Sequence, residues 1–316
     1  MQIKENVLIV GGAGYVGGYL TDYLISEKYN VRVFDKLLYE DSYLKKVDFI
    51  FGDILDFNSI NKHLDWADVV IWLSALVGDP ACALNPALTM KTNVDSVKNL
   101  VSNFRGRIVF LSTCSVYGAQ DGLLDEESSL NPLSLYAESK ILAEKVLIES
   151  ESNSVIFRLG TLFGLSDQFA RLRADLVLNV LTIRATLEDK MSVFGGHQFR
   201  PLLHVKDVST AILPNIVSSV NGIFNLHTEN INIIELARLV NKVVPSATLE
   251  ISESSFQDSR NYMVSSNKAR KLFGFTPKYT LMDGIKEVHE VILSKRIPNV
   301  KLPRFSNAAT LESLIK

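Results

Sequence analysis

The chain has 316 residues, of which 47% are hydrophobic and 22% are charged, a composition that is ordinary for a globular protein with a large core. Its formal net charge of −2 gives no electrostatic footprint for nucleic acid or for an anionic membrane. Two cysteines, Cys82 and Cys114, occur without a CxxC pair or a His/Cys cluster, so neither a disulfide scaffold nor a metal site is expected.

Short, β-branched apolar runs recur through the first half of the chain, at residues 6–10, 30–34, 47–52, 67–75, 107–113 and 154–160. Because they are apolar on both faces, they suit the strands of a parallel sheet that helices cover. Amphipathic segments of helix length lie between them, for example at 17–28, 92–104 and 136–150. This alternation predicts an α/β fold with a doubly wound parallel sheet.

The alternation loosens after about residue 165. Segments 175–190 and 232–244 have helical patterns, and strand-like pieces lie at 191–195, 222–227 and 247–252. We expect a smaller mixed α/β domain over the carboxyl edge of the sheet. The expected division is a first domain of residues 1–165, to which 203–228 return, and a second domain of 166–202 and 229–316.

No apolar run reaches the roughly 18 residues that a membrane span needs, and a strand begins by residue 7 with no signal peptide before it. We therefore expect a soluble, cytoplasmic protein. Two short basic stretches, RLR (171–173) and NKARK (267–271), are expected to be solvated faces of helices rather than polyanion sites.

The stretch GGAGYVGG (11–18) places five glycines where a helix should begin. Glycines 12, 14 and 17 fit G-x-G-x-x-G, and glycines 11, 14 and 17 fit G-x-x-G-x-x-G equally well. At the first strand-to-helix turn of a βαβ unit, glycines let a pyrophosphate approach the backbone, and the helix N-terminus supplies free N–H groups. The pattern predicts a dinucleotide turn.

Asp35 ends the next predicted strand, 18 residues after Gly17. A carboxylate at this distance holds the adenosine ribose hydroxyls of a dinucleotide. Because it would repel a 2′-phosphate, NAD is favoured over NADP, although Lys36 beside it leaves NADP open.

Tyr136 and Lys140 in YAESK are spaced i and i+4, on one face of a predicted helix. A neighbouring ammonium lowers the pKa of a phenol and favours the phenolate. Thr113 lies at the carboxyl end of a predicted strand, where ligands of such sheets bind. The three residues are candidates for catalysis.

Seven motifs occur in order: GGAGYVGG (11–18), GD (52–53), LSALVG (73–78), STCSVYG (112–118), YAESK (136–140), FRLGTLFG (157–164) and FRPLLHVKDVSTA (199–211). With them the chain resembles the extended short-chain dehydrogenases/reductases of the NAD-dependent nucleotide-sugar epimerase/dehydratase family, over nearly its whole length to about residue 295. The resemblance implies an NAD-binding Rossmann domain, a nucleotide-sugar-binding second domain and a homodimer paired through 92–104 and 136–150.

The resemblance implies roles for individual residues. Tyr136 is the general base and acid, Lys140 lowers its pKa and holds the nicotinamide ribose, and Thr113 hydrogen-bonds the reacting oxygen. The other implied cofactor residues are Gly11, Gly14, Tyr15, Val16, Gly17, Asp35, Lys36, Asp53, Ile54, Leu73, Ser74, Ala75 and Asn93. The implied substrate residues are Val77, Gly78, Thr113, Thr161, Asp175, Leu176, Arg200 on the diphosphate, and Arg260 as a second clamp.

Some positions depart from the family pattern. The family's 4,6-dehydratases have an Asp-Glu pair after the catalytic Thr, whereas Cys114 and Ser115 stand here, so dehydration is not expected. Cys114 is expected to be a packed small residue, because the cysteine of 3,5-epimerising members falls at Ser115. Thr161 replaces an asparagine that is common in the family, which leaves the sugar open. His204 is expected to be a structural, hydrogen-bonding histidine, and Trp66 and Trp72 are expected to be core residues.

Together the motifs predict NAD-dependent oxidoreduction at C4 of a nucleotide-activated sugar, of the 4-epimerase or 4-dehydrogenase type. An NAD(P)H-dependent 4-ketoreductase of a nucleotide-linked keto sugar stays open, as does a non-catalytic NAD-binding sensor or scaffold.

Overall fold

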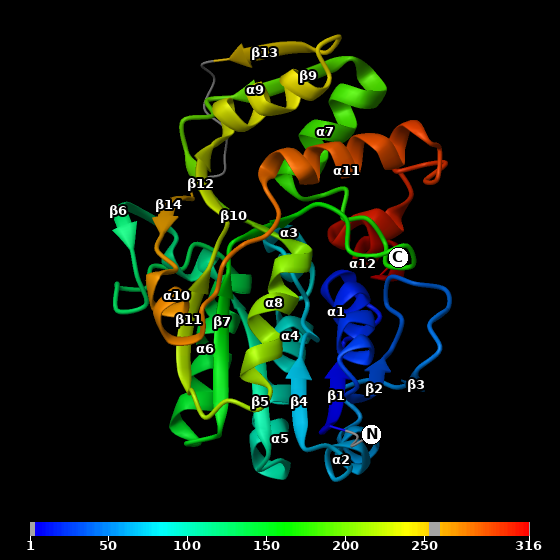
Figure 1. The fold of residues 1–316 in the computed structure, drawn as a ribbon, viewed down its shortest axis with the longest axis vertical. Helices are drawn as coiled ribbons and strands as arrows, with labels where there is room; N and C mark the ends of the chain where they lie inside the picture. Colours follow the sequence, from blue (N-terminus) through cyan, green and yellow to red (C-terminus); the bar gives the residue numbers. More distant parts are fainter. Residues whose placement is uncertain (1–3, 253–259, 316) are drawn as a thin grey trace.

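The computed structural model describes residues 4–252 and 260–315. Its largest sheet has seven strands, all parallel, in the order β11-β7-β5-β4-β1-β2-β3 (Figure 1). The strands are β1 (Asn6–Val10), β2 (Asn30–Asp35), β3 (Asp48–Phe51), β4 (Val69–Trp72), β5 (Arg107–Thr113), β7 (Ser154–Leu159) and β11 (Gly222–Leu226). The predicted fold class is confirmed.

Helices cover both faces of this sheet. One apolar core joins it to α1 (Tyr15–Ser26), α8 (Val205–Asn215) and α10 (Asn267–Phe273). A second core, on the opposite face, joins it to α2 (Phe57–Leu64), α5 (Ser96–Asn103) and α6 (Leu135–Glu149). Alternate residues of one strand enter different cores, as Val7 and Leu8 of β1 do, which explains why these strands are apolar on both faces.

A smaller assembly lies beyond the carboxyl ends of the sheet strands (Figure 1). Its core joins α7 (Val177–Glu188), α9 (Ile233–Val243) and α11 (Leu281–Leu293). Its strands are β8 (Thr161–Phe163), β10 (Phe199–His204) and β12 (Glu229–Asn232) in one sheet, and β9 (Lys190–Phe194) with β13 (Thr248–Ser252) in another. A further pair, β6 (Ala119–Leu124) and β14 (Asn261–Val264), lies at the side of the large sheet.

The strand order reverses between β1 and β4, the neighbours at the centre of the sheet. Loops that leave two such strands diverge to opposite faces, and the crevice between them is where ligands bind in open α/β sheets. Two short helices, α3 (Asp79–Leu84) and α4 (Pro86–Met90), follow β4, and the C-terminal helix α12 (Asn307–Ile315) packs against α3. The end of the chain therefore returns to the crevice.

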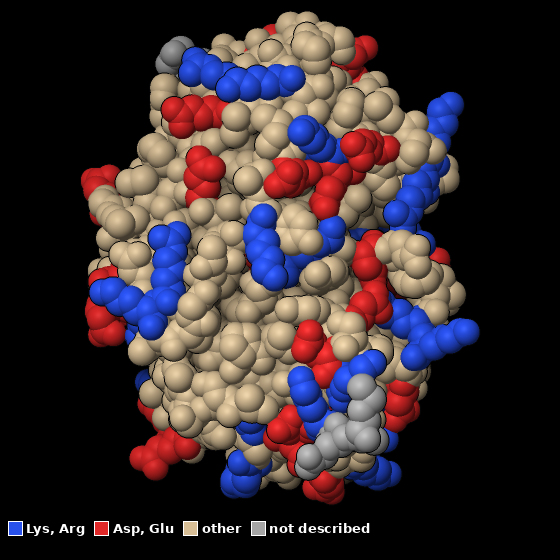
Figure 2. Space-filling model, in the orientation of Figure 1, with Lys and Arg blue, Asp and Glu red and all other residues tan. Residues whose placement is uncertain are grey.

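Lysine and arginine are interspersed with aspartate and glutamate over the face shown in Figure 2. No helix within residues 4–252 and 260–315 is long and apolar enough to cross a bilayer. NKARK forms part of α10, where Arg270 and Lys271 are exposed as expected.

The expected structural residues are mostly where the sequence places them. Trp72 is buried in the core, and His204 is buried with Nε2 3.0 Å from a carboxylate oxygen of Glu287. Trp66 differs from the prediction, because it is only half-buried at the edge of the core and carries the Arg32 guanidinium 4.0 Å from its ring centre.

Candidate active site

The glycine turn connects β1 to α1, and its shape depends on two close approaches. Gly11 has φ +85°, and a Cβ there would lie 2.7 Å from the backbone nitrogen of Ser74. A Cβ at Gly17 would lie 2.3 Å from the carbonyl oxygen of Gly12, so only glycine lets the helix start close to the turn. The first amides of α1 are thus brought to the crevice, where an anion can bind them.

Asp35 closes this end of the crevice. Its two carboxylate oxygens accept hydrogen bonds from the backbone N–H of Ala13 at 3.0 Å and of Leu37 at 2.7 Å. Burial raises the pKa of Asp35, and these amide donors oppose that rise. Lys36, which left NADP open in the sequence, lies 3.1 Å from a carboxylate oxygen of Asp53. That pairing fits a cofactor without a 2′-phosphate.

A cavity of about 290 Å³ runs from the glycine turn to α6. Thirteen of the fifteen residues predicted to bind the cofactor line it: Gly11, Gly14, Tyr15, Val16, Asp35, Lys36, Asp53, Ile54, Leu73, Ser74, Ala75, Tyr136 and Lys140. The two others, Gly17 and Asn93, do not. Gly17 shapes the turn, and the Asn93 amide holds the backbone of Leu76 at 2.8 and 2.9 Å and bonds Ser139 at 2.9 Å. Both therefore position residues of the cavity wall.

The catalytic candidates meet at the inner end of this cavity. The Ser134 hydroxyl accepts a hydrogen bond from the N–H of Ala137 at 3.2 Å and so caps the start of α6. Tyr136, in the first turn, lines the cavity together with Thr113 at the end of β5. Lys140 follows one turn later, with Nζ 4.1 Å from the centre of the Phe110 ring.

Burial dominates the ionisation of Tyr136 and Lys140. Burial raises the pKa of Tyr136, and Thr113 and the charge of Arg173 act against this rise. Burial also lowers the pKa of Lys140 to about 7. The expectation that Lys140 favours the phenolate of Tyr136 stays a prediction.

A second cavity, of about 540 Å³, adjoins the first. Most predicted substrate residues line it: Val77, Gly78, Thr161, Asp175, Leu176, Arg200 and Arg260. The Arg260 guanidinium lies 3.0 Å from a carboxylate oxygen of Asp79, and Arg200 donates to the carbonyl oxygen of Arg260. Val77, Thr161 and Arg260 line both cavities, and Thr113 lines the first. Ligands in the two cavities would therefore meet at the shared wall of Val77, Thr161 and Arg260.

RLR (171–173) is not a solvated helix face, and this prediction is wrong. The stretch lies before α7 in irregular backbone, and Arg171 and Arg173 are only 6% and 9% exposed. Both line the first cavity, and Arg173 also lines the second, with Nε 2.6 Å from Asp175. The sequence feature that could have indicated this burial is the i, i+2 spacing of Arg171 and Arg173 around Leu172, which is buried in a separate apolar cluster. In extended chain this spacing points both guanidinium groups to one side.

The turn after Thr113 bears out the packing predicted for Cys114. Its side chain is fully buried, with Sγ 3.2 Å from the carbonyl oxygen of Arg158, and burial raises the pKa of its thiol. Ser115 lines the first cavity, with its hydroxyl 3.5 Å from that of Tyr262. Neither residue is an acid or base of the kind that expels water.

The sequence model of the NAD dependent epimerase/dehydratase family matches residues 7–226. UDP-glucuronic acid decarboxylase 1 of Xenopus tropicalis is 24% identical over 332 residues, which cover 97% of this chain and 78% of that protein. UDP-glucose 4-epimerase of Lactobacillus helveticus is 26% identical, with 88% of this chain and 94% of that one covered. The solved structure of TunA, an NAD dependent NDP-hexosamine 5,6-dehydratase, has the same fold, with a TM-score of 0.82, 22% identity, and 94% and 100% of the two chains covered. The three names describe three reactions.

Proposed function

Because the chain belongs to the NAD dependent epimerase/dehydratase family, we propose that it uses NAD to oxidise C4 of a nucleotide-activated sugar, as a 4-epimerase or a 4-dehydrogenase. One observation carries the proposal. The Thr113 and Tyr136 side chains line the cavity of the glycine turn, and this cavity shares Val77, Thr161 and Arg260 with the cavity of Arg200.

The first cavity fits a dinucleotide. It begins at a glycine turn that a Cβ would block, and the Asp35 carboxylate, fixed by two backbone amides, stands at the ribose position. A bound nicotinamide accepts a hydride from the substrate carbon and can return it.

The chain's own residues move the proton. Tyr136 takes the proton of the C4 hydroxyl while that carbon loses hydride, which leaves a 4-keto sugar. Thr113, which lines the same cavity, steadies the reacting oxygen. Because burial raises the pKa of Tyr136, loss of its proton depends on nearby positive charge, and Arg173 is a cation that lowers this pKa. Arg173 therefore belongs with Lys140 in the catalytic environment.

The second cavity suits the nucleotide diphosphate. Arg200 and Arg260 are linked through one hydrogen bond and bring two guanidinium groups to the cavity, a donor geometry that matches phosphate oxygens. Leu176 and Val177 supply apolar wall for a base.

Incubation with UDP-, dTDP-, GDP- and CDP-hexoses, followed by mass spectrometry and chromatography, tests the proposal. An isomer of equal mass without net NADH indicates a 4-epimerase, and a product two hydrogens lighter with NADH indicates a 4-dehydrogenase. NADH consumption with a 4-keto sugar would instead support the ketoreductase. Tight binding of NAD without turnover of any sugar would support the sensor. Loss of one water would contradict the proposal, because Cys114 and Ser115 supply no acid/base pair for dehydration. Tyr136→Phe is the control that should form no product.

A further inference from the structure

We propose that Arg171 binds the pyrophosphate of the dinucleotide and is held in place for this by the C-terminal segment 303–315. The inference rests on the family's NAD dependence and on the first cavity, and it does not depend on which sugar reaction follows.

The segment that precedes Arg171 is fastened to the start of α1. Tyr15 donates its hydroxyl proton to the carbonyl oxygen of Gly164 at 2.5 Å, and the N–H of Tyr19 donates to the Ser166 hydroxyl at 2.9 Å. A Cβ at Gly18 would lie 2.6 Å from that of Ala170, so this chain segment lies directly on the first turns of the helix. The next residue along is Arg171. It is thereby carried to the end of α1 whose amides favour a pyrophosphate.

Arg171 is a buried cation, with the carboxylates of Asp175 and Glu40 near enough to raise its pKa but without a direct ion pair to either. Its guanidinium stacks 4.0 Å from the centre of the Tyr39 ring, and Nη1 donates to the carbonyl oxygen of Arg304 at 2.9 Å. Nη2 donates to the side-chain oxygen of Asn307, while Nε is buried with no acceptor. Within residues 4–252 and 260–315 no carboxylate forms an ion pair with this side chain. Burial and the nearby charge of Arg173 lower the pKa of Arg171 to about 10. An anion bound in the cavity would therefore offset both the desolvation of the guanidinium and its repulsion from Arg173.

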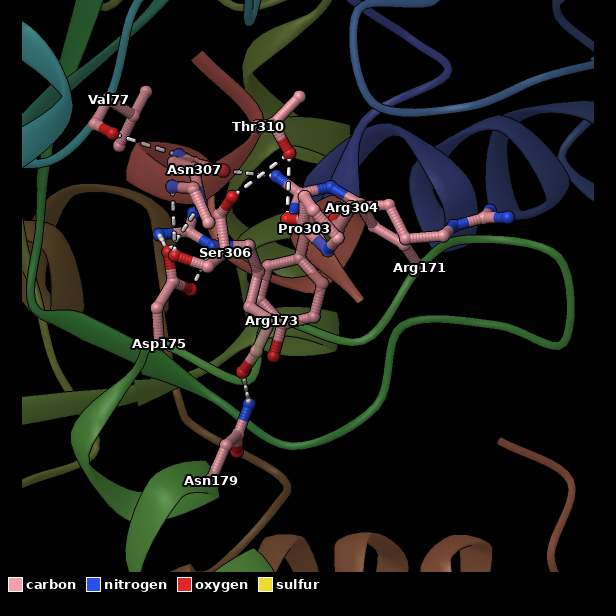
Figure 3. Close-up of polar contacts among 12 residues, drawn as sticks. Val77, Arg171, Arg173, Asp175, Asn179, Pro303, Arg304, Ser306, Asn307 and Thr310 are labelled. Carbon is pink, nitrogen blue, oxygen red and sulfur yellow. Dashed lines mark hydrogen bonds and ion pairs between the residues drawn. The ribbon is translucent and has the colours of Figure 1, made fainter. Parts of the chain in front are cut away.

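The C-terminal segment fixes this geometry (Figure 3). Beyond its bond to Arg171, Asn307 donates its side-chain N–H to the carbonyl oxygen of Val77 at 2.8 Å, and its backbone N–H to Asp175 at 2.8 Å. Arg304 pairs with Glu40, which in turn accepts the backbone N–H of Arg171 at 3.1 Å. Asn307 is thus a positioning residue that connects the loop after β4 to the arginine.

Arg171 and Arg200 lie in different cavities, and this difference indicates which of two possible diphosphates each arginine would bind. Arg171 lines the cavity of the glycine turn but not the second cavity, whereas Arg200 lines the second but not the first. The pyrophosphate of the dinucleotide is therefore assigned to Arg171, and the diphosphate of a nucleotide sugar is not.

Arg107 provides a matched control. It is also buried, its pKa is also lowered to about 10 by burial, and it lies at the opposite end of β5. Its Nε donates to Asn215 at 3.0 Å, and its two terminal nitrogens donate to Asn153, Asn221 and Val220. The donors of Arg107 are thus occupied within the protein, as a purely structural arginine requires.

Calorimetric titration of unliganded Arg171→Gln, Arg171→Lys and Arg107→Gln with NAD, ADP-ribose, adenosine and UDP tests the proposal. Arg171→Gln should weaken NAD and ADP-ribose roughly 10- to 100-fold, and Arg171→Lys less, because a charged hydrogen bond to phosphate is lost or impaired. Adenosine and UDP should change less than about threefold, and Arg107→Gln should bind all four like the unchanged protein. An equal loss of affinity for adenosine, a loss of affinity for UDP in place of NAD, or no loss of affinity at all would each overturn the assignment.

Two further measurements guard against a folding artefact. The melting temperature of each unliganded variant is recorded, and if Arg171→Gln is unfolded the comparison between NAD and adenosine is made with Arg171→Lys. Asn307→Ala should also weaken NAD, and should weaken it less when Arg171 is already Gln, because the two residues act through one contact. Additive losses would refute the positioning role of the C-terminal segment.

Discussion

Replacement of Lys140 by methionine should stabilise the cofactor-free protein, and the gain should depend on pH. The lysine is only 3% exposed, and burial lowers its pKa from 10.5 to about 7. Between these two values the unfolded chain holds one proton more than the folded protein does. The free energy of unfolding of the unchanged protein therefore rises with pH through this window, and it is lowest below pH 7, where a charged ammonium must stay buried. Methionine has no such proton and fills similar space.

The size of this pH dependence follows from the lowering of the Lys140 pKa from 10.5 to about 7. One pH unit within the window corresponds to ~1.4 kcal/mol, so the difference between Lys140→Met and the unchanged protein should shrink by roughly 2 kcal/mol from pH 7 to pH 9. For a chain of this size that is about 4 °C in melting temperature.

Scanning calorimetry of both proteins, freed of nucleotide, from pH 6 to pH 9 measures this difference. Lys145→Met on the same helix is the control, because the Lys145 side chain is 62% exposed and should give no pH-dependent difference. A melting-temperature difference for Lys140→Met that stays constant across this range would refute the reasoning. Loss of activity in the stabilised variant would show that the lysine is kept for catalysis at a cost in stability.

Other predictions address the cofactor cavity and the assembly. Tyr136→Phe should lower kcat ~10²- to 10⁴-fold with NAD affinity unchanged in titration, and retention of more than about half of the activity would exclude the assigned role. Asp35→Asn should weaken NAD and narrow its advantage over NADP, as measured by titrating both cofactors; equal wild-type affinity for the two would contradict it. Gly17→Ala should lower the melting temperature, because its Cβ would lie 2.3 Å from a carbonyl oxygen, whereas Gly14→Ala should mainly weaken NAD, because the nearest atom is 3.3 Å away. Light scattering should report a homodimer at micromolar concentration, and a monomer would contradict the family-based expectation.

The large sheet was predictable because each strand is apolar on both faces. β1 and β5 have the predicted bounds, at Asn6–Val10 and Arg107–Thr113, since burial on both sides leaves an uninterrupted apolar run. Helix starts were less predictable. α1 begins at Tyr15 rather than at residue 17, because Gly17 and Gly18 are needed inside the helix for close packing. The predicted helix at 92–104 opens with a π-helical turn at Lys91–Asp95, which contains Asn93 with its inward hydrogen bonds.

The homodimer expected from the family resemblance stays a prediction. The two segments expected to pair, 92–104 and 136–150, contain more apolar positions than one buried stripe needs, for example Val94, Val97, Leu100, Val101, Ile141, Leu142, Val146 and Leu147. In the structure, Val94, Val97, Leu100 and Leu147 are buried within the single chain, and Leu142 is 40% exposed. One face of α6 packs against the sheet and the neighbouring helices α5 and α3, while Glu138, Leu142, Lys145 and Glu149 lie exposed on the other face. The number of apolar residues in these segments does not distinguish contacts within the chain from contacts with a second copy of it.

The side of the cofactor cavity that short motifs build was predictable, because strand order fixes the geometry of those motifs, but the side that the second half of the chain builds was not. That side is built by contacts of long sequence separation. Arg171 meets Asn307 across 136 positions, and Tyr15 meets Gly164 across 149. Contacts between residues far apart in sequence leave no local periodicity. The short basic pattern of Arg171 and Arg173, which are buried in irregular chain, therefore could not be told from that of a solvated helix face. Because the second half of the chain is bonded to the glycine turn and to the loop after β4 around this cavity, cofactor affinity and the packing of the two halves depend on the same residues. A substitution such as Asn307→Ala, far from the reacting atoms, is therefore expected to act on both.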